Sequence, residues 1–122
     1  MSIINLTQTN FDNIITSNEI VLIDFWAEWC GPCKSFAGIY ESVAQEYPTI
    51  IFGKVDIEKE QQLAADFQVK SIPLLMVFKE KVAIYSEAGL LPESALRDLI
   101  NQAVNLDMTE IHKQIAEQRG AE

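Results

Sequence analysis

Both cysteines of this chain lie in one short segment, Cys30-Gly31-Pro32-Cys33. An apolar run precedes this segment and an amphipathic run follows it, which predicts a strand, a turn and a helix that begins at the cysteines. The free N–H groups and the dipole at a helix N-terminus stabilise a thiolate, which is the nucleophile of disulfide exchange. The spacing places the two thiols about one helical turn apart, within reach of a disulfide. We therefore expect the pair to cycle between dithiol and disulfide.

The residues between the cysteines fit this arrangement. Pro32 suits the first turn of a helix, where its missing N–H is not needed, and Gly31 permits a close backbone approach. The main alternative for such a pair is half of a zinc site. That alternative lacks ligands, because the chain has no other cysteine and only one histidine, His112. We expect no metal and no bound cofactor.

The composition excludes several classes of partner. A chain of 122 residues with 48% hydrophobic and 22% charged residues has the size and balance of one globular domain. Its net charge of −9 argues against nucleic acid and anionic membranes as partners. The first residues lack the pattern of a secretory signal, and the longest apolar runs, 20–23 and 72–78, are too short to span a bilayer. We expect a cytoplasmic protein, where a lone cysteine pair is more often catalytic than structural.

The elements that would position the cysteines follow an α/β pattern. Apolar and β-branched runs predict strands at 3–6, 20–26, 50–56, 74–79 and 82–87. Helical periodicity predicts helices from Asn10 to Ile15, from the cysteines to Tyr47, around 63–67 and from Pro92 to about Val104. Alternation of strand and helix implies a parallel pair, and the two last strands form a hairpin. The sequence therefore predicts a central mixed sheet with helices on both faces.

One charged residue interrupts the most apolar strand. Asp24 lies within 20–26, a run that is apolar on both faces and typical of a central strand. A buried carboxyl has a raised pKa, which suits proton transfer better than an ordinary surface role. Asp24 is therefore a candidate functional residue.

The end of the chain is expected to form a separate unit. We divide the sequence into a domain at 1–105 and an extension at 106–122. Asp107 is expected to cap a helix with an apolar stripe of Met108, Ile111 and Ile115. So short a helix is marginal alone in water. Packing on its own domain is favoured slightly over docking to a partner, and both remain open.

From about Ile3 to Val104 the chain resembles the thioredoxins. The resemblance is carried by the segment 21–34, which reads VLIDFWAEWCGPCK, by Lys54-Val55-Asp56, by Ser71-Ile72-Pro73 and by Gly89. A bare C-x-x-C pair is weak evidence, but these motifs in this order are specific. The resemblance implies a thioredoxin fold and protein disulfide reductase activity. It also implies disulfide-containing target proteins as partners, and reducing equivalents from NADPH through a thioredoxin reductase.

The resemblance also implies roles for single residues. Cys30 would attack the target disulfide and Cys33 would resolve the mixed disulfide. Asp24 would relay a proton to or from Cys33, with Lys54 near it. The remaining implied residues form the surface that receives the target, with Pro73 as a cis-proline facing the cysteines: Trp29, Gly31, Pro32, Ile72, Pro73 and Gly89. We expect Trp26 inside the protein and Trp29 at its surface.

Three departures from the family pattern qualify this interpretation. Leu74 replaces the usual threonine after the proline, Gly38 replaces the proline that bends the long helix, and Glu80-Lys81 replaces a glycine-containing turn. We expect a more apolar target groove, a straighter or softer helix, and a strained or lengthened turn. An oxidase or isomerase is disfavoured by the Gly-Pro dipeptide and the missing signal. A thioredoxin-fold interaction subunit that uses the extension remains an alternative function.

Overall fold

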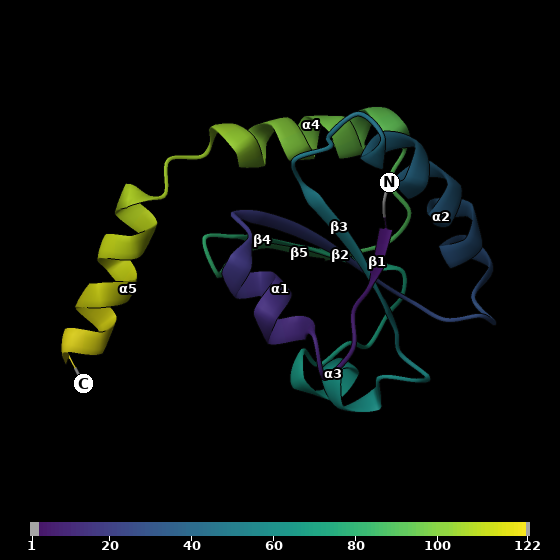
Figure 1. The fold of residues 1–122 in the computed structure, drawn as a ribbon, viewed down its shortest axis with the longest axis horizontal. Helices are drawn as coiled ribbons and strands as arrows, with labels where there is room; N and C mark the ends of the chain where they lie inside the picture. The colour runs from purple at the N-terminus through teal and green to yellow at the C-terminus, as the bar shows by residue number, and fades with distance from the viewer. Residues whose placement is uncertain (1–2, 122) are drawn as a thin grey trace.

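A mixed sheet of five strands forms the centre of the molecule (Figure 1). The computed structural model describes residues 3–121. The strands are β1 (Ile3–Asn5), β2 (Ile20–Trp26), β3 (Ile51–Asp56), β4 (Leu74–Lys79) and β5 (Val82–Ala88). Their spatial order is β1-β3-β2-β4-β5, with β1 and β2 parallel to β3 and with β4 antiparallel to both its neighbours. The predicted mixed sheet is confirmed.

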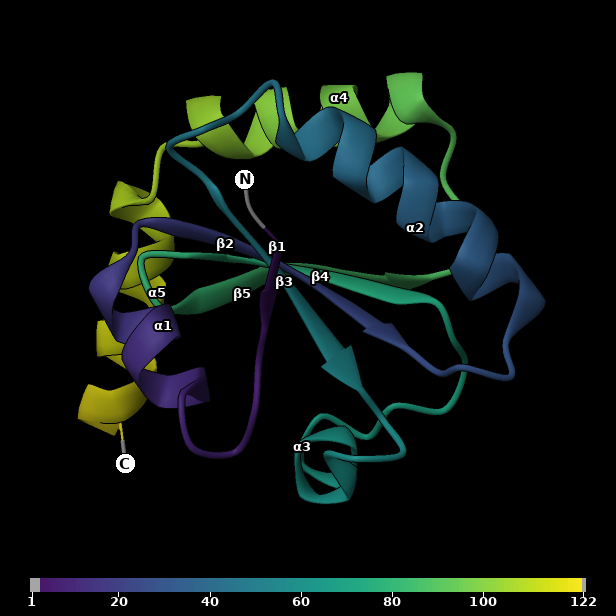
Figure 2. The same ribbon diagram turned by 45° about the vertical axis from the view of Figure 1, so that its right-hand side comes forward.

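Helices cover both faces of this sheet, as expected. They are α1 (Phe11–Ser17), α2 (Gly31–Ala44), α3 (Gln61–Asp66), α4 (Glu93–Asn105) and α5 (Thr109–Ala121). Figure 2 shows α2 and α4 on one face and α1 and α3 on the other. Alternation along β2 sends Leu22 into the core under α2 and α4, and Ile23 and Phe25 into the core under α1 and α3. The same alternation places Asp24 on the α2 face.

Most element bounds differ from the sequence-based prediction by one or two residues, and two differences at helix ends have a clear cause. The long helix ends at Ala44 rather than Tyr47, because Glu46 N–H and Tyr47 N–H bond to carbonyls three residues back and tighten the chain into a turn. Tyr47 still packs against the core, so the helical spacing of its side chain was misleading about the backbone. Asn10 precedes α1 but does not cap it, since its Oδ1 accepts the Thr7 N–H at 2.8 Å instead.

The structure shows the effect of two departures from the family pattern, Gly38 in the long helix and Glu80-Lys81 in the last turn. α2 runs without interruption through Gly38, where an added Cβ would meet no atom within 4 Å. The turn between β4 and β5 keeps two residues, so the lengthened form is wrong. Glu80 and Lys81 both take positive φ, 51° and 72°. Positive φ is costly for residues with a Cβ, which makes this turn the strained form of the expectation.

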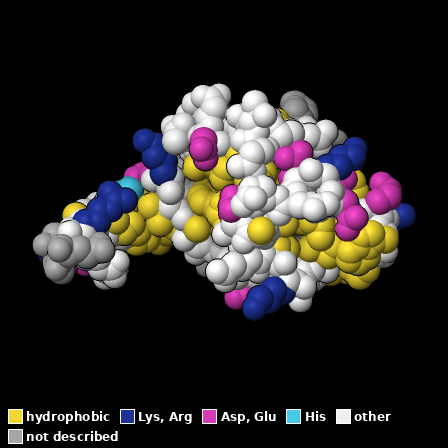
Figure 3. Space-filling view, turned by 90° about the horizontal axis from the view of Figure 1, so that it is seen from below, with side chains coloured by type: hydrophobic (Ala, Val, Ile, Leu, Met, Phe, Trp, Pro, Cys, Tyr) yellow, Lys and Arg dark blue, Asp and Glu magenta, His cyan; other side chains and the backbone are white. Residues whose placement is uncertain are grey.

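The extension contacts the domain where its helix begins. Asp107 Oδ1 accepts the Thr109 N–H at 2.9 Å, which confirms the predicted cap, and Met108 is buried. Further along α5, His112 Nε2 lies 2.7 Å from Glu80 Oε1. Figures 1 and 3 show α5 projecting from the domain. Ile111 and Ile115 are only partly covered. The helix therefore packs on its own domain chiefly through its first turn.

A buried lysine fixes the point where the extension begins. Lys79, at the end of β4, is only 3% exposed, and its Nζ donates to the carbonyl oxygens of Ala103, Val104 and Leu106 at 2.7, 3.1 and 2.7 Å. These carbonyls lie at and just beyond the C-terminal end of α4, where backbone acceptors lack helical partners and a positive charge is favourable. The direction in which the chain leaves α4 is therefore set by the fold.

Within residues 3–121 no helix is long and apolar enough to cross a bilayer.

Candidate active site

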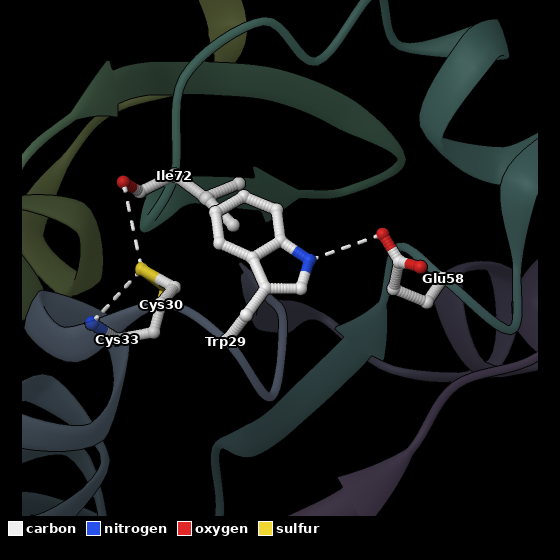
Figure 4. Close-up of a disulfide and its surroundings, with 5 residues drawn as sticks. All are labelled: Trp29, Cys30, Cys33, Glu58 and Ile72. Atoms are coloured by element: carbon white, nitrogen blue, oxygen red, sulfur yellow. Dashed lines mark hydrogen bonds between the residues drawn. A yellow bond between two sulfur atoms is a disulfide. The ribbon is translucent and has the colours of Figure 1, made fainter.

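The two cysteines lie where β2 gives way to α2. The strand ends at Trp26, and α2 begins at Gly31 with Pro32 in its first turn, so Cys30 is the N-cap residue. Cys30 and Cys33 form a disulfide. The Cys33 N–H donates to Cys30 Sγ at 3.2 Å (Figure 4). The same N–H and the helix dipole would stabilise a Cys30 thiolate once the disulfide is reduced. This geometry supports the predicted chemistry.

The two sulfurs have different surroundings. Cys30 is 5% exposed and Cys33 1%, so a target disulfide has better access to Cys30. Cys30 Sγ also lies 3.9 Å from the carbonyl oxygen of Ile72, on the loop that faces the cysteines. Cys33 points into the molecule and packs with Ala27 in the small core cluster beneath the site. The pair therefore has an outer and an inner sulfur.

The loop opposite the cysteines contains a cis peptide. The bond between Ile72 and Pro73 is cis, as the resemblance implied. The Gly89 N–H, at the end of β5, donates to the Pro73 carbonyl oxygen at 2.8 Å and ties the two segments together. Gly89 has φ of 117°, a region that favours glycine over residues with a Cβ. The predicted residues Ile72, Pro73 and Gly89 therefore form one unit beside the sulfurs.

An exposed indole lies beside the sulfurs. Trp29 is 68% exposed, and its Nε1 donates to Glu58 Oε2 at 3.1 Å (Figure 4). The hydrogen bond fixes the orientation of a large apolar side chain at the surface, close to Cys30 and the half-buried Ile72. Gly31 and Pro32 are also exposed. The predicted exposure of Trp29 is confirmed, whereas Trp26 is only partly inside the protein.

A buried carboxyl lies in the strand that leads to the cysteines. Asp24 is 0% exposed, and neither of its carboxyl oxygens has a hydrogen-bond partner among the residues that the structure describes. Burial disfavours the charged form and raises the pKa of Asp24 to about 7, against a smaller lowering by the charge of Lys54. A carboxyl with a pKa near neutrality exchanges protons readily at cellular pH.

Lys54 lies next to Asp24 in the sheet but forms no ion pair with it. The two residues are directly aligned in the parallel register of β2 and β3. The Lys54 Nζ lies 4.7 Å from the ring centroid of Trp26, a cation–π arrangement. Lys54 therefore acts on Asp24 through its charge. The Trp26 Nε1 is buried without a hydrogen-bond partner in the described part of the chain.

The sequence identified the reacting groups but not three residues whose contacts hold the structure around the site or the start of the extension. Glu58 holds Trp29, Lys79 anchors the extension, and Tyr40 places a hydroxyl in the core under α2. Lys79 had a signal, because it shares the parity of the inward-facing Leu75 and Val77 in β4. No pattern in the sequence indicated the role of Glu58.

Within residues 3–121 no three His, Cys, Asp or Glu residues are grouped as metal ligands.

Comparison with known proteins decides the family. The family model described as Thioredoxin matches residues 2–102, most of the chain and all of the site. The chain belongs to the thioredoxin family. As a thioredoxin-family protein with an intact Cys30–Cys33 pair, it is a thiol-disulfide oxidoreductase with the site of a protein disulfide reductase.

Relatives agree with this assignment. The chain is 53% identical over 118 residues to putative thioredoxin 2 of Streptomyces coelicolor, covering 97% of this chain and 88% of that protein. It is 38% identical to the thioredoxin of Bacillus subtilis, covering 84% of this chain and 98% of that one. A solved thioredoxin variant from Halobacterium salinarum superimposes with a TM-score of 0.80 at 32% identity, covering 87% and 94% of the two chains. The first match reaches into the extension.

Proposed function

We propose that this thioredoxin-family protein is a general cytoplasmic protein disulfide reductase. The Cys30 thiolate attacks one sulfur of a target disulfide, so that a mixed disulfide forms and the second target sulfur leaves as a thiolate. The Cys33 thiolate then attacks Cys30 Sγ, which forms the Cys30–Cys33 disulfide and releases the first target sulfur. The target gains two electrons and the dithiol loses two. The N-cap position of Cys30, with the Cys33 N–H on its sulfur, is the observation that carries this proposal.

Asp24 is the proposed proton acceptor for the inner thiol. Cys33 must lose its proton before it attacks, and ordinary thiols have a pKa of about 8.5. Asp24 has a pKa of about 7 and lies on the sheet face that α2 covers. It is charged in part at neutral pH, so it takes a proton from Cys33 and later returns one to solvent or to a leaving thiolate. Lys54 supplies a positive charge that favours the carboxylate.

The surface around Cys30 is the proposed docking site for targets. It combines a fixed exposed indole with a backbone carbonyl beside the sulfur, through Trp29 and Ile72. The other residues proposed to contact the target are Gly31, Pro32, Pro73 and Gly89. Leu74 follows the cis-proline and is half-buried, so we propose a more apolar groove there than a threonine would provide.

The proposed source of electrons is NADPH, delivered through a thioredoxin reductase. The reductase would reduce the Cys30–Cys33 disulfide on the same surface that receives targets, since the outer sulfur is the accessible one. The cycle would serve electron transport and cell redox homeostasis. It needs no bound cofactor, because the electrons reside in the cysteine pair.

The extension supports a second candidate function. Lys79 anchors the end of α4, and α5 projects with Ile111 and Ile115 only partly covered. A helix that projects from an anchored start suits an interaction subunit, with residues 1–105 as the catalytic domain and 106–122 as the added unit. The site described above lies outside this extension, and so we rank this function second.

Truncation tests whether the extension takes part in catalysis, which neither candidate function requires. A chain that ends at Leu106 retains the three carbonyl partners of Lys79 and loses α5. We expect it to reduce insulin with NADPH and a thioredoxin reductase at the rate of the full chain, because every proposed site residue precedes the cut. The rate of NADPH consumption, followed at 340 nm, measures insulin reduction, since on the order of one NADPH is used per disulfide.

A Cys30→Ser variant of the full chain gives the background rate. If the truncated protein is folded but turns over at that background rate, the extension is part of the active site and the proposed division of the chain is wrong.

A further inference from the structure

A buried hydroxyl lies under α2 on the face of the sheet that carries Asp24. Tyr40 is 0% exposed, and its Oη donates to the Gly53 carbonyl oxygen at 2.9 Å. Its ring packs against Phe36 and Phe52, with centroids 5.6 and 5.2 Å apart. The hydroxyl is therefore held at one place, over β3.

That place lies on the strand beside the one that carries the carboxyl. Gly53 directly precedes Lys54, the residue aligned with Asp24 in the pairing of β2 and β3. Burial, and then the charge of Asp24, raise the pKa of Tyr40 well above its usual value, so the two groups lie within electrostatic reach. Both Asp24 oxygens lack a donor in the described structure. Tyr40 is thus a buried donor within electrostatic reach of an acceptor that has no donor.

We propose that Tyr40 is a positioning residue for Asp24. The Tyr40 O–H points to the Gly53 carbonyl when Asp24 is protonated, and it turns toward the carboxylate, which it reaches through one water, when Asp24 is ionised. This inference rests on the proposed role of Asp24 as proton acceptor. A hydrogen bond to a charged oxygen is stronger than one to a neutral carbonyl, so ionisation itself drives the change of partner. Hydroxyl rotors need no backbone movement for such a change.

The consequence is a carboxyl tuned by two opposing effects. Burial alone makes Asp24 a strong base that would hold its proton. A donor that engages only the charged form lowers that proton affinity and lets Asp24 release the proton after each cycle. A purely structural tyrosine, which tethers α2 to β3 through Gly53, would leave the proton affinity of Asp24 unchanged.

The variant Tyr40→Phe keeps the ring and removes the hydroxyl. We expect it to raise the pKa of Asp24 by about one unit, the lower range for a lost hydrogen bond to a charged group. Titration of the Asp24 carboxyl carbon by NMR in the reduced full-length protein measures the shift. The pH profile of insulin reduction should move upward with it.

Tyr47→Phe is the matched control. It removes another hydroxyl, the one that bonds to Asn101 Oδ1 at 3.1 Å on the surface, and should leave both readings in place. A folded Tyr40→Phe protein with the same Asp24 pKa as the unmodified chain would overturn the inference.

A second measurement needs no variant. The Tyr40 Cζ resonance of the unmodified reduced protein should change with pH at the midpoint of the Asp24 titration, because its hydroxyl changes partner there. A flat resonance through that midpoint also overturns the inference. The role of Asp24 is judged separately: if Asp24→Asn keeps the pH profile of turnover, proton transfer by Asp24 fails, while the titration of Asp24 still decides the part played by Tyr40.

Discussion

Replacing Cys33 by serine is expected to stop catalytic turnover and to leave target proteins covalently bound to Cys30. Attack by Cys30 remains possible, because its N-cap position and its bond from the residue 33 N–H do not need the second sulfur. Resolution is lost, because a positioned intramolecular group acts at an effective concentration on the order of 10⁵ M or more. External thiols replace it poorly. We expect turnover to fall by more than about a hundredfold.

The measurement is insulin reduction together with mass spectrometry of the trapped complexes. Cys30→Ser is the matched control, since it removes the outer sulfur and keeps the inner, 1% exposed one. It should be equally inactive and should trap no target. Trapping by Cys30→Ser and none by Cys33→Ser would reverse the assigned roles of the two cysteines.

Replacing Asp24 by asparagine is expected to change the pH dependence of stability. The pKa of Asp24 is raised from 3.8 to about 7 in the folded protein, so the folded state binds the proton more tightly than the unfolded state. The contribution of Asp24 to stability is therefore greatest below its unfolded pKa and is lost as pH rises toward its folded pKa. The raised pKa corresponds to a penalty of about 4 kcal/mol above neutral pH.

Asparagine removes that penalty and adds the cost of burying an amide without partners, about 1–3 kcal/mol. We expect Asp24→Asn to raise the free energy of unfolding by about 1–3 kcal/mol near pH 8, and by much less near pH 5. Urea denaturation at the two pH values measures the difference. Asp98→Asn, which changes an exposed carboxylate of α4, should keep the slope of the unmodified chain.

Asp24→Asn should also lower turnover at neutral pH by about tenfold. General bases contribute about 10²–10⁴ in many enzymes, but a thiol with a pKa of about 8.5 already ionises in part near neutrality. If Asp24→Asn shows normal turnover, and its free energy of unfolding depends on pH as in the unmodified chain, Asp24 neither transfers the proton nor carries the stability penalty.

The fold was predictable where one residue pattern had one structural solution. The run 20–26 is apolar on both faces, which only a central covered strand accommodates, and Cys30 follows directly at the next helix. Asp24 was identified because a charge is so costly in that run. Tyr47 was misassigned because a tight turn kept its side chain at helical spacing after the helix had ended.

The support around the site was harder to predict, because it depends on contacts between distant segments. Glu58 reaches Trp29 across 29 residues, and Tyr40 reaches Gly53 from another element. No spacing along the chain encodes these pairs. The cis bond at Pro73 was anticipated from the resemblance alone, since the general preference of X–Pro bonds is trans.

The reduction potential of the Cys30–Cys33 pair tests the central claim most directly, because it gives the direction in which the pair exchanges electrons. Equilibration with glutathione buffers, followed by counting free thiols, measures it. We expect the value typical of thioredoxins, about −270 mV, at which the dithiol reduces most target disulfides. A value of about −180 mV or higher, typical of isomerases and oxidases, would contradict the assignment of this protein as a reductase.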